Sequence, residues 1–270
     1  MQISSNSLKS IAPIQVDDLI RIGRKRDGGY ILSQRQFDKT KAILSFGIST
    51  DWSFESSFGK QKKEDIAIYA YDYSVSPTSY LRNIGNVFLH PSILNLKTAI
   101  KSIPCIFTFN PFFNAQKKRF FFKKYVGTTD NEQYISVPQI FKENLSDQEN
   151  LSILVKMDVE GAEWEILPAF KPYYSLINGF AIEFHYRAVD SPLFKKTIAD
   201  LSSDFYIAHV HANNGGGYLP NTSMPALLEI TFINKKLVPE IPKLSTRTYP
   251  IKGLDFPCLP RKAEIPLVFQ

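Results

Sequence analysis

Short apolar runs of strand length alternate with segments of helical pattern along most of the chain. This alternation is typical of βαβ units that build a largely parallel sheet. Helical patterns begin at Ser53 and at Pro138, where proline is tolerated because the first N–H groups of a helix are unpaired. The sequence therefore predicts an α/β fold with a Rossmann-like, doubly wound, mostly parallel sheet. The strongest predicted strands are 42–46, 66–71, 153–157, 179–186, 206–211 and 227–233, with weaker candidates at 87–89 and 106–109.

Turn signals mark the two ends of this predicted fold. Asp27-Gly28-Gly29 separates two short extended pieces, so we expect a hairpin before the main sheet. A polar loop over 212–225 joins the last two predicted strands, and such a hairpin adds an antiparallel part to the end of the sheet. We expect one domain over 1–270, with an N-terminal extension over 1–40 and an irregular, Pro-rich tail over 236–270.

The composition is that of an ordinary globular protein, with 44% hydrophobic and 21% charged residues among 270. No apolar run approaches the roughly 20 residues that cross a bilayer, and the first residues lack the apolar core of a secretory signal. We therefore expect a cytoplasmic protein without a transmembrane segment. Cys105 and Cys258 are far apart and fit no metal-ligand spacing, so neither a disulfide framework nor a zinc site is predicted. The oligomeric state is left open.

The formal net charge of +6 is partly concentrated in one basic and aromatic segment, which we interpret as an insertion over 110–124. Five basic residues surround Phe120 to Phe122 and Tyr125: Lys117, Lys118, Arg119, Lys123 and Lys124. Such a pattern can bind single-stranded nucleic acid or a membrane surface. It equally fits an amphipathic segment whose Phe side chains pack inward, which is the interpretation we favour. We expect no nucleic-acid partner.

The most informative segment is LVKMDVEGAEWEIL, from Leu154 to Leu167. It predicts a buried strand that delivers Asp158 and Glu160 to its carboxyl end and then turns through Gly161 into a helix. Ligands of open α/β sheets bind outside the carboxyl ends of the strands, so a site is expected here. The adjacent Glu163 and Glu165 have a simpler explanation, because carboxylates in the first turn of a helix oppose its dipole favourably.

The turn FGISTDWSFE after the first predicted strand has the position of a nucleotide-binding loop. Gly47 allows close backbone approach, although a dinucleotide fingerprint has three glycines where this turn has one. Asp72 ends the second strand about 20 residues later, where doubly wound folds place an acid on ribose hydroxyls. The two features together favour an adenosine-type ligand, with NAD or an adenosyl compound preferred over NADP.

Side chains at i and i+2 lie on one face of a strand, so three pairs are predicted at the later strand ends. They are Asp158 with Glu160, Glu183 with His185, and His209 with His211. If these ends meet, the acids and histidines form either a general base near carboxylates or a divalent metal site, together with Asn213 and Asn214. For any single histidine, a structural hydrogen-bonding role is an equal alternative.

Several motifs occur in the order and at the separations of a known family: DGGY, SFGISTDWSFE, YAYD, VKMDVEGAEWEIL, AIEFH and HANN. Over roughly 21–233 the chain resembles the FkbM-type methyltransferases. The resemblance implies a class I methyltransferase-like fold that uses S-adenosylmethionine to methylate an oxygen of a sugar, glycan or other small hydroxylated acceptor. The first loop departs from typical methyltransferases, since it lacks their multiple glycines and leading acid.

The resemblance also assigns roles to residues of this chain. Those implied to bind the cofactor are Phe46, Gly47, Ile48, Asp51, Asp72 and Asp158, and those implied to be catalytic are His185, Asp158, Glu183 and His211. We assign the general base to His185, with His211 as the substitute candidate. A divalent metal held by Asp158, Glu183 and His185 is left open. Two other functions fit the same pattern: a non-catalytic protein that binds a nucleotide sugar or metabolite, and a metal-dependent hydrolase.

Overall fold

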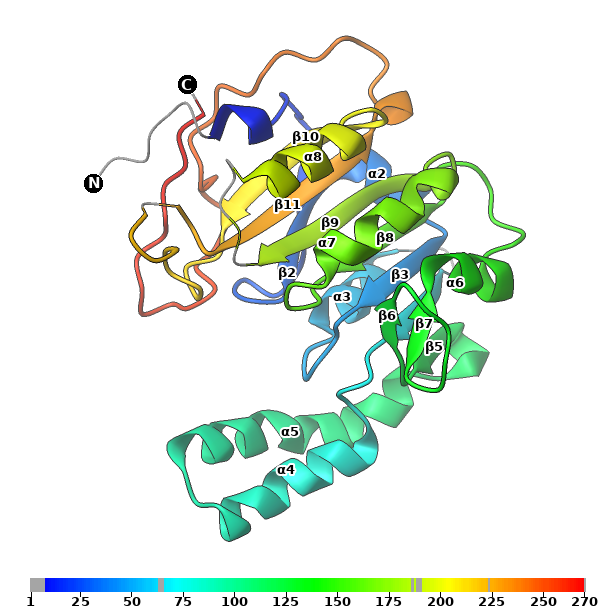
Figure 1. The fold of residues 1–270 in the computed structure, drawn as a ribbon, viewed down its shortest axis with the longest axis vertical. Helices are drawn as coiled ribbons and strands as arrows, with labels where there is room; N and C mark the ends of the chain where they lie inside the picture. Colours follow the sequence, from blue (N-terminus) through cyan, green and yellow to red (C-terminus); the bar gives the residue numbers. More distant parts are fainter. Residues whose placement is uncertain (1–7, 63–65, 186, 188–190, 223, 270) are drawn as a thin grey trace.

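The computed structural model describes residues 8–62, 66–185, 187, 191–222 and 224–269. Seven strands form the central sheet in the order β10-β11-β9-β8-β3-β4-β5 (Figure 1). They are β3 (Ala42–Phe46), β4 (Ala67–Tyr71), β5 (Arg119–Phe122), β8 (Ile153–Met157), β9 (Ile177–His185), β10 (Phe205–Ala212) and β11 (Leu227–Asn234). Only β11 runs against the others, because it is antiparallel to both β9 and β10.

This sheet confirms the predicted doubly wound, mostly parallel fold with an antiparallel terminal hairpin. Counted from β3 along the chain, the parallel strands have the spatial order 3-2-1-4-5-6 of dinucleotide-binding sheets, with β11 inserted between the fifth and sixth. At this end of the sheet the edge strand is therefore β10, and the antiparallel strand β11 lies next to it, between β10 and β9. The strand order changes direction between β3 and β8, and this switch point is where such folds bind ligands.

Both faces of the sheet are covered, which explains why β3, β8 and β9 are buried at every position and read as continuous apolar runs. One core packs β8 and β9 against α6 (Val137–Asn144), α7 (Glu163–Ile166), η3 (Leu167–Tyr173) and α8 (Pro192–Leu201). The other core packs the opposite face against α3 (Ser53–Gln61) and the N-terminal hairpin of β1 (Leu19–Gly23) and β2 (Gly29–Ser33). The predicted hairpin around Asp27-Gly28-Gly29 is thus confirmed.

Smaller elements complete the body. They are η1 (Lys9–Ile11), α2 (Gln34–Lys39), η2 (Ala115–Lys117), the parallel pair β6 (Tyr125–Gly127) and β7 (Tyr134–Ser136), and η4 (Lys235–Leu237). The described part of the tail after η4 has no helix or named strand. An isolated bridge from Leu244 to Ile14 attaches it to the body, and a bridge from Tyr249 to Leu267 joins two parts of the tail.

The largest departure from the sequence prediction is a helical hairpin of α4 (Pro77–Leu89) and α5 (Ile93–Phe112), which projects from the body (Figure 1). The weak strands predicted at 87–89 and 106–109 are wrong, since both lie inside these helices. Short apolar runs do not distinguish helix from strand, whereas the capping residues do: Ser76 and Ser92 each accept a hydrogen bond from the third residue of the helix that follows. In the described chain, no helix combines the length and apolar character needed to cross a membrane.

The predicted basic-aromatic insertion over 110–124 also needs correction. Its first residues end α5, and 119–122 form β5, the strand at one edge of the main sheet. Phe120 stacks on Tyr69 and Phe122 stacks on Tyr71 across the β4–β5 pair. Aromatic cross-strand pairs of this kind stabilise a sheet, which explains the aromatic run without a binding role.

Candidate functional site

The turn after β3 packs directly against the end of β8. Gly47 has φ +74°, and a Cβ atom at this position would lie 1.7 Å from the carbonyl oxygen of Asp158. The Asp158 N–H donates to the Phe46 carbonyl (3.0 Å), and the buried Lys156 ammonium donates to the Gly47 carbonyl (2.7 Å). Only glycine fits here, and its presence brings the carboxyl ends of β3 and β8 together at the switch point.

The Asp72 side chain is hydrogen-bonded to the same turn. One of its carboxylate oxygens accepts a hydrogen bond from the Ser49 N–H (2.9 Å), and the other accepts from the N–H and hydroxyl of Ser74 (2.8 and 2.6 Å). Asp51, at the end of the turn, forms an ion pair with Arg24 of the N-terminal hairpin (2.8 Å). Asp51, Asp72 and Asp158 therefore all border the 47–51 loop, although Asp51 is already engaged by the hairpin.

The other two residues expected to bind the cofactor are core residues. The side chains of Phe46 and Ile48 are 0% and 1% exposed. Phe46 packs against Tyr71 and Phe170 within the core. A ligand could therefore contact these two positions only through their backbone groups.

His185, the last residue of β9, is surrounded by carboxylates. Its Nδ1 is hydrogen-bonded to the carboxylate of Glu163, and its Nε2 lies 3.6 Å from Asp158 Oδ1, 3.6 Å from Glu160 Oε2 and 3.8 Å from Glu183 Oε2. The structure thus brings Asp158, Glu183 and His185 together as the strand periodicity predicts. The three longer distances exceed those of direct hydrogen bonds, so these carboxylates surround the Nε2 atom at ion-pair distance.

Glu163 is a site residue that the sequence analysis missed. Its side chain is fully buried, and its carboxylate fixes the orientation of the His185 ring. Burial acts to lower the pKa of His185, but Glu163, followed by Asp158 and Glu160, outweighs burial and raises that pKa above its ordinary value. The sequence offers one indication of this contact, because Glu163 begins the helix that directly follows the site strand. A favourable interaction with the helix dipole explains that position equally well.

Glu183 lies between two polar groups on neighbouring strands. The Asn213 amide donates to Glu183 Oε1 (2.7 Å), and Glu229 of β11 stands directly opposite in the strand register. Burial raises the pKa of Glu183 well above its ordinary value, and the charges of Asp158 and Glu229 raise it further. The Glu183 carboxyl therefore favours its protonated form, so it can donate a hydrogen bond.

His211 belongs to a neighbouring cluster that fastens the C-terminal tail. Its Nδ1 pairs with Glu229 Oε2 (2.9 Å) and its Nε2 with Glu264 Oε2 (3.3 Å), so both ring nitrogens are engaged. Burial acts to lower the pKa of His211, but Glu229 and Glu264 raise it to about 10. Because carboxylates engage both ring nitrogens of His211, the geometry favours a structural role in fastening the tail, and the substitute role as general base stays a prediction.

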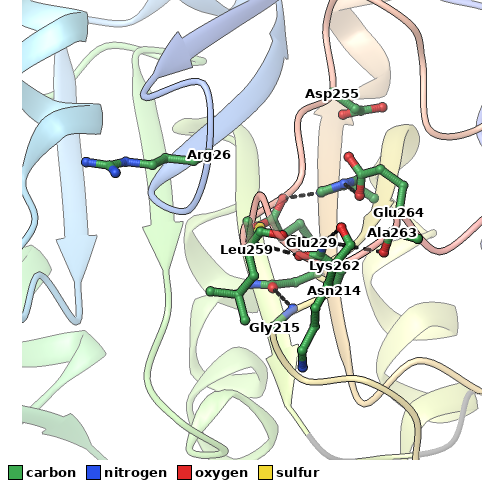
Figure 2. A network of polar contacts seen from close by, with 12 residues as sticks. Arg26, Asn214, Gly215, Glu229, Asp255, Leu259, Lys262, Ala263 and Glu264 are labelled. Atoms are coloured by element: carbon green, nitrogen blue, oxygen red, sulfur yellow. Dashed lines mark hydrogen bonds and ion pairs between the residues drawn. The ribbon is translucent and has the colours of Figure 1, made fainter. Parts of the chain in front are cut away.

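Asn214 extends this fastening. Its side-chain amide donates to the carbonyls of Leu259 (3.1 Å) and Lys262 (3.0 Å), and its oxygen accepts from the Leu259 N–H (2.8 Å). Figure 2 shows these tail residues gathered around Asn214, with Glu229 and Glu264 beside them. Asn213 therefore bonds to the acid cluster through Glu183, whereas Asn214 bonds to the tail. His209 likewise contacts the tail through Asp255 (3.1 Å).

Two groups in the described residues have the composition of a metal site. Ligand atoms of Asp158, Glu183 and His185 all lie within 4.8 Å of one another, and those of His211, Glu229 and Cys258 do so as well. In the first group, Glu163 occupies the second nitrogen of the histidine, which is the usual arrangement of a metal-binding imidazole. Carboxylate oxygens with one imidazole suit Mg²⁺ or Mn²⁺.

A cavity of about 540 Å³ begins directly after Asp72. It lies between the start of α4 and the segment after β5, and Ser74 connects its wall to the Asp72 carboxylate. Two cations and six hydroxyl groups line it: Arg82, Lys123, Tyr73, Ser74, Ser76, Thr78, Ser79 and Tyr125. Its size lies within the range of small-molecule sites.

Neither a protein-family model nor a curated protein matches this chain. Among solved structures, the chain is 14% identical to a Methanococcus jannaschii fibrillarin pre-rRNA processing protein, with a TM-score of 0.35 over 82% of this chain and 84% of that chain. The precorrin-6y C5,15-methyltransferase of Geobacter metallireducens GS-15 is 12% identical, with a TM-score of 0.31 over 72% and 80% of the two chains. The MccD protein is 11% identical, with a TM-score of 0.32 over 73% and 91%. At these identities and TM-scores, the similarities say nothing about the chemistry of the site.

Proposed function

We propose that this protein is an S-adenosylmethionine-dependent methyltransferase of the FkbM type that methylates a hydroxyl oxygen of a sugar, glycan or other small metabolite. The observation that carries the proposal is the His185 imidazole, which Glu163 holds through Nδ1 while Nε2 faces Asp158, Glu160 and Glu183. This group stands at the carboxyl ends of β8 and β9, beside the Gly47 turn.

The cofactor has a matching place at the switch point. Asp72 would accept hydrogen bonds from the ribose hydroxyls, as an acid at the end of the second strand does in doubly wound folds, and the cavity that follows it would hold the adenine. The 47–51 backbone runs along the methionine part. The Asp158 carboxylate, with 29% of its side chain exposed, lies near the sulfonium and attracts its positive charge.

Methyl transfer needs an acceptor oxygen in line with the sulfonium carbon, and most of the rate comes from this positioning. When bound, S-adenosylmethionine would supply the methyl group for transfer to the acceptor oxygen, and S-adenosylhomocysteine would be the product. His185 Nε2 takes the hydroxyl proton, and the Glu163 carboxylate stabilises the imidazolium that results. The Glu183 carboxyl, which the Asn213 amide holds in place, orients the acceptor.

A divalent cation fits the same residues. Asp158, Glu183 and His185 would hold it, and its charge would relieve the repulsion between the buried carboxylates of Glu183 and Glu229. When bound, such an ion supplies polarisation of an acceptor hydroxyl. This cluster also favours the second candidate function, a metal-dependent hydrolase. The two functions differ in that the hydrolase would bind metal and act without an adenosyl cofactor.

The proposal is tested with methyl-labelled S-adenosylmethionine and a panel of hydroxylated sugars and glycans. We expect the wild-type protein to label at least one acceptor, with His185→Ala about 10²–10⁴-fold slower because it lacks the base. Asp38→Ala, on the exposed end of α2, is the matched surface control. Hydrolysis of a panel member in the absence of the cofactor, with no transfer of label, would support the hydrolase instead.

A further inference from the structure

The α4–α5 hairpin exposes an unusual amount of apolar surface. In the described chain, nine of the 16 exposed large hydrophobic side chains belong to these two helices. Phe88 is 83% exposed, Ile93 76% and Phe107 72%, and most of this surface lies on the part that projects from the body (Figure 1). Continuous exposed apolar surface of this kind marks a site of interaction.

In the projecting part of the hairpin the buried groups are small or polar, whereas the large buried side chains Tyr80, Phe109 and Phe112 lie where the hairpin joins the body. Ala99 and Ser102 of α5 are buried, and the Asn83 amide of α4 donates to the Ser102 hydroxyl (3.2 Å). A helix pair of a water-soluble protein places its large apolar side chains inside and its polar groups outside. The reverse arrangement, with small residues and interhelical hydrogen bonds inside, is typical of helices that pack in lipid.

The charge of this region has a single sign. The 57 residues from 73 to 129 contain eight Lys and Arg and no Asp or Glu, whereas the rest of the chain has 24 basic and 26 acidic residues. The whole positive excess of the protein is therefore on the hairpin and the segment that follows it. Clusters of Lys and Arg beside apolar surface are attracted to anionic lipid headgroups.

We propose that the α4–α5 hairpin docks on the surface of an anionic lipid membrane. Its large apolar side chains enter the boundary between headgroups and acyl chains, while Arg82, Lys97 and Lys101 contact the headgroups. A second copy of this chain is a poorer partner, because pairing two hairpins would oppose regions that both lack acids.

The hairpin is firmly joined to the body, so docking would also orient the site. Phe109 and Phe112 at the end of α5 pack on Trp52, with ring centroids 5.7 and 6.3 Å apart. Ser76, Thr78 and Arg82 at the start of α4 line the cavity that begins after Asp72. Membrane contact through the hairpin would therefore hold that cavity close to the lipid surface.

Vesicle co-sedimentation of the full-length protein tests this proposal. We expect binding to phosphatidylcholine vesicles that contain phosphatidylglycerol, and much weaker binding to phosphatidylcholine alone. The triple variant Phe88→Ser, Ile93→Ser and Phe107→Ser should weaken binding more than about 100-fold, because it removes three large apolar side chains from the docking surface. Lys97→Glu with Lys101→Glu should weaken it roughly 10–100-fold.

Matched controls separate docking from a general effect of apolar or charged groups. Ile241→Ser, Leu244→Ser and Val268→Ser change three exposed apolar residues of the tail, and Lys39→Glu with Lys171→Glu changes two exposed lysines of the body. Both controls should bind vesicles like the wild type. Circular dichroism and thermal unfolding report that each variant is folded, independently of lipid and of any cofactor.

Three results would overturn the proposal: no binding of the wild type to anionic vesicles, equal losses in the hairpin variants and their controls, or a stable dimer that the apolar hairpin variant dissociates while vesicle binding is absent. The last result would assign the hairpin to self-association. None of these results depends on methyl transfer, so the proposed function stands or falls separately.

Discussion

At the scale of single residues, the site centres on one imidazole that is fixed by one buried carboxylate and faces three others. Glu163 holds Nδ1 of His185, so Nε2 is the nitrogen turned toward the other acids, and the surrounding acids raise the pKa of that histidine. A base must be neutral to accept a proton. The raised pKa therefore makes His185 a stronger base that becomes available only at higher pH.

This relation predicts the pH dependence of the reaction. The rate should rise with pH through a pKa above the ordinary value of about 6.5 for histidine. In Glu163→Gln, loss of the carboxylate charge lowers the pKa of His185, so the rising limb should move to lower pH while the maximal rate falls roughly 10–100-fold. Rate measurements across pH check this. An unchanged limb in the variant would mean that Glu163 does not act on the base.

We also predict that Gly47 cannot be replaced, because of how closely it packs against β8. Gly47→Ala places a Cβ where the Asp158 carbonyl oxygen stands, at a backbone φ of +74°. The variant should lose more than about 1–3 kcal/mol of unfolding free energy, because the ends of β3 and β8 must separate. Gly253→Ala is the control, since it has φ +88° and open space around its added Cβ. Equal losses in urea unfolding would show that backbone strain alone accounts for the effect.

The residues that the sequence could identify are those whose placement follows from strand periodicity. Asp158, Glu183 and His185 are correctly grouped because i and i+2 positions share a face and parallel strands end together. The partners of Glu163 and His211 were not predicted, because they are set by the turn after β8, by the strand register and by the tail. The strand register places Glu229 beside His211, and the course of the C-terminal tail brings Glu264 to the same ring. Neither contact is marked by a local sequence pattern.

At the scale of elements, the C-terminal tail is joined to the sheet by a buried cation. The His211 ring connects Glu229 of β11 with Glu264 of the tail. The pKa of His211 is about 10 in the folded protein and about 6.5 when unfolded. A raised pKa contributes stability that is fully present below about pH 6.5 and is lost as the pH rises through about 10.

The protein should therefore lose stability between neutral pH and about pH 10. His211→Gln keeps a hydrogen-bonding side chain but not the charge, so the part of this pH dependence that His211 contributes should disappear. Thermal unfolding at a series of pH values checks the prediction. If wild type and variant show parallel curves, the ion pair does not hold the tail.

Six of the seven strands of the sheet were predictable within a few residues, whereas β5 and the α4–α5 hairpin were not. The buried strands are marked by continuous apolar runs between turn signals. The hairpin carries its apolar residues on its outer surface, so its periodicity does not point to a core. Its identity as a helix pair depends on serine caps that precede weak apolar patterns.

At the scale of the whole molecule, charge and apolar surface are separated. The α4–α5 hairpin is basic and contains no acid, and it projects from a body that carries all 26 Asp and Glu residues of the chain. Because surface charges are screened by salt, binding to anionic vesicles should weaken as NaCl is raised past physiological strength. Sedimentation at increasing NaCl measures this. Binding that does not change with salt would mean that apolar contact alone drives docking and that the charge separation has no part in it.

The central claim is that the switch point between β3 and β8 binds an adenosyl cofactor, and calorimetric titration tests it most directly. We predict that the wild type binds S-adenosylmethionine and S-adenosylhomocysteine. Asp72→Ala should bind both about 10–100-fold more weakly, because a charged hydrogen-bond acceptor is lost, while the exposed control Asp147→Ala should bind normally. A wild-type protein that binds neither compound, or that binds only a nucleotide sugar, would contradict the account.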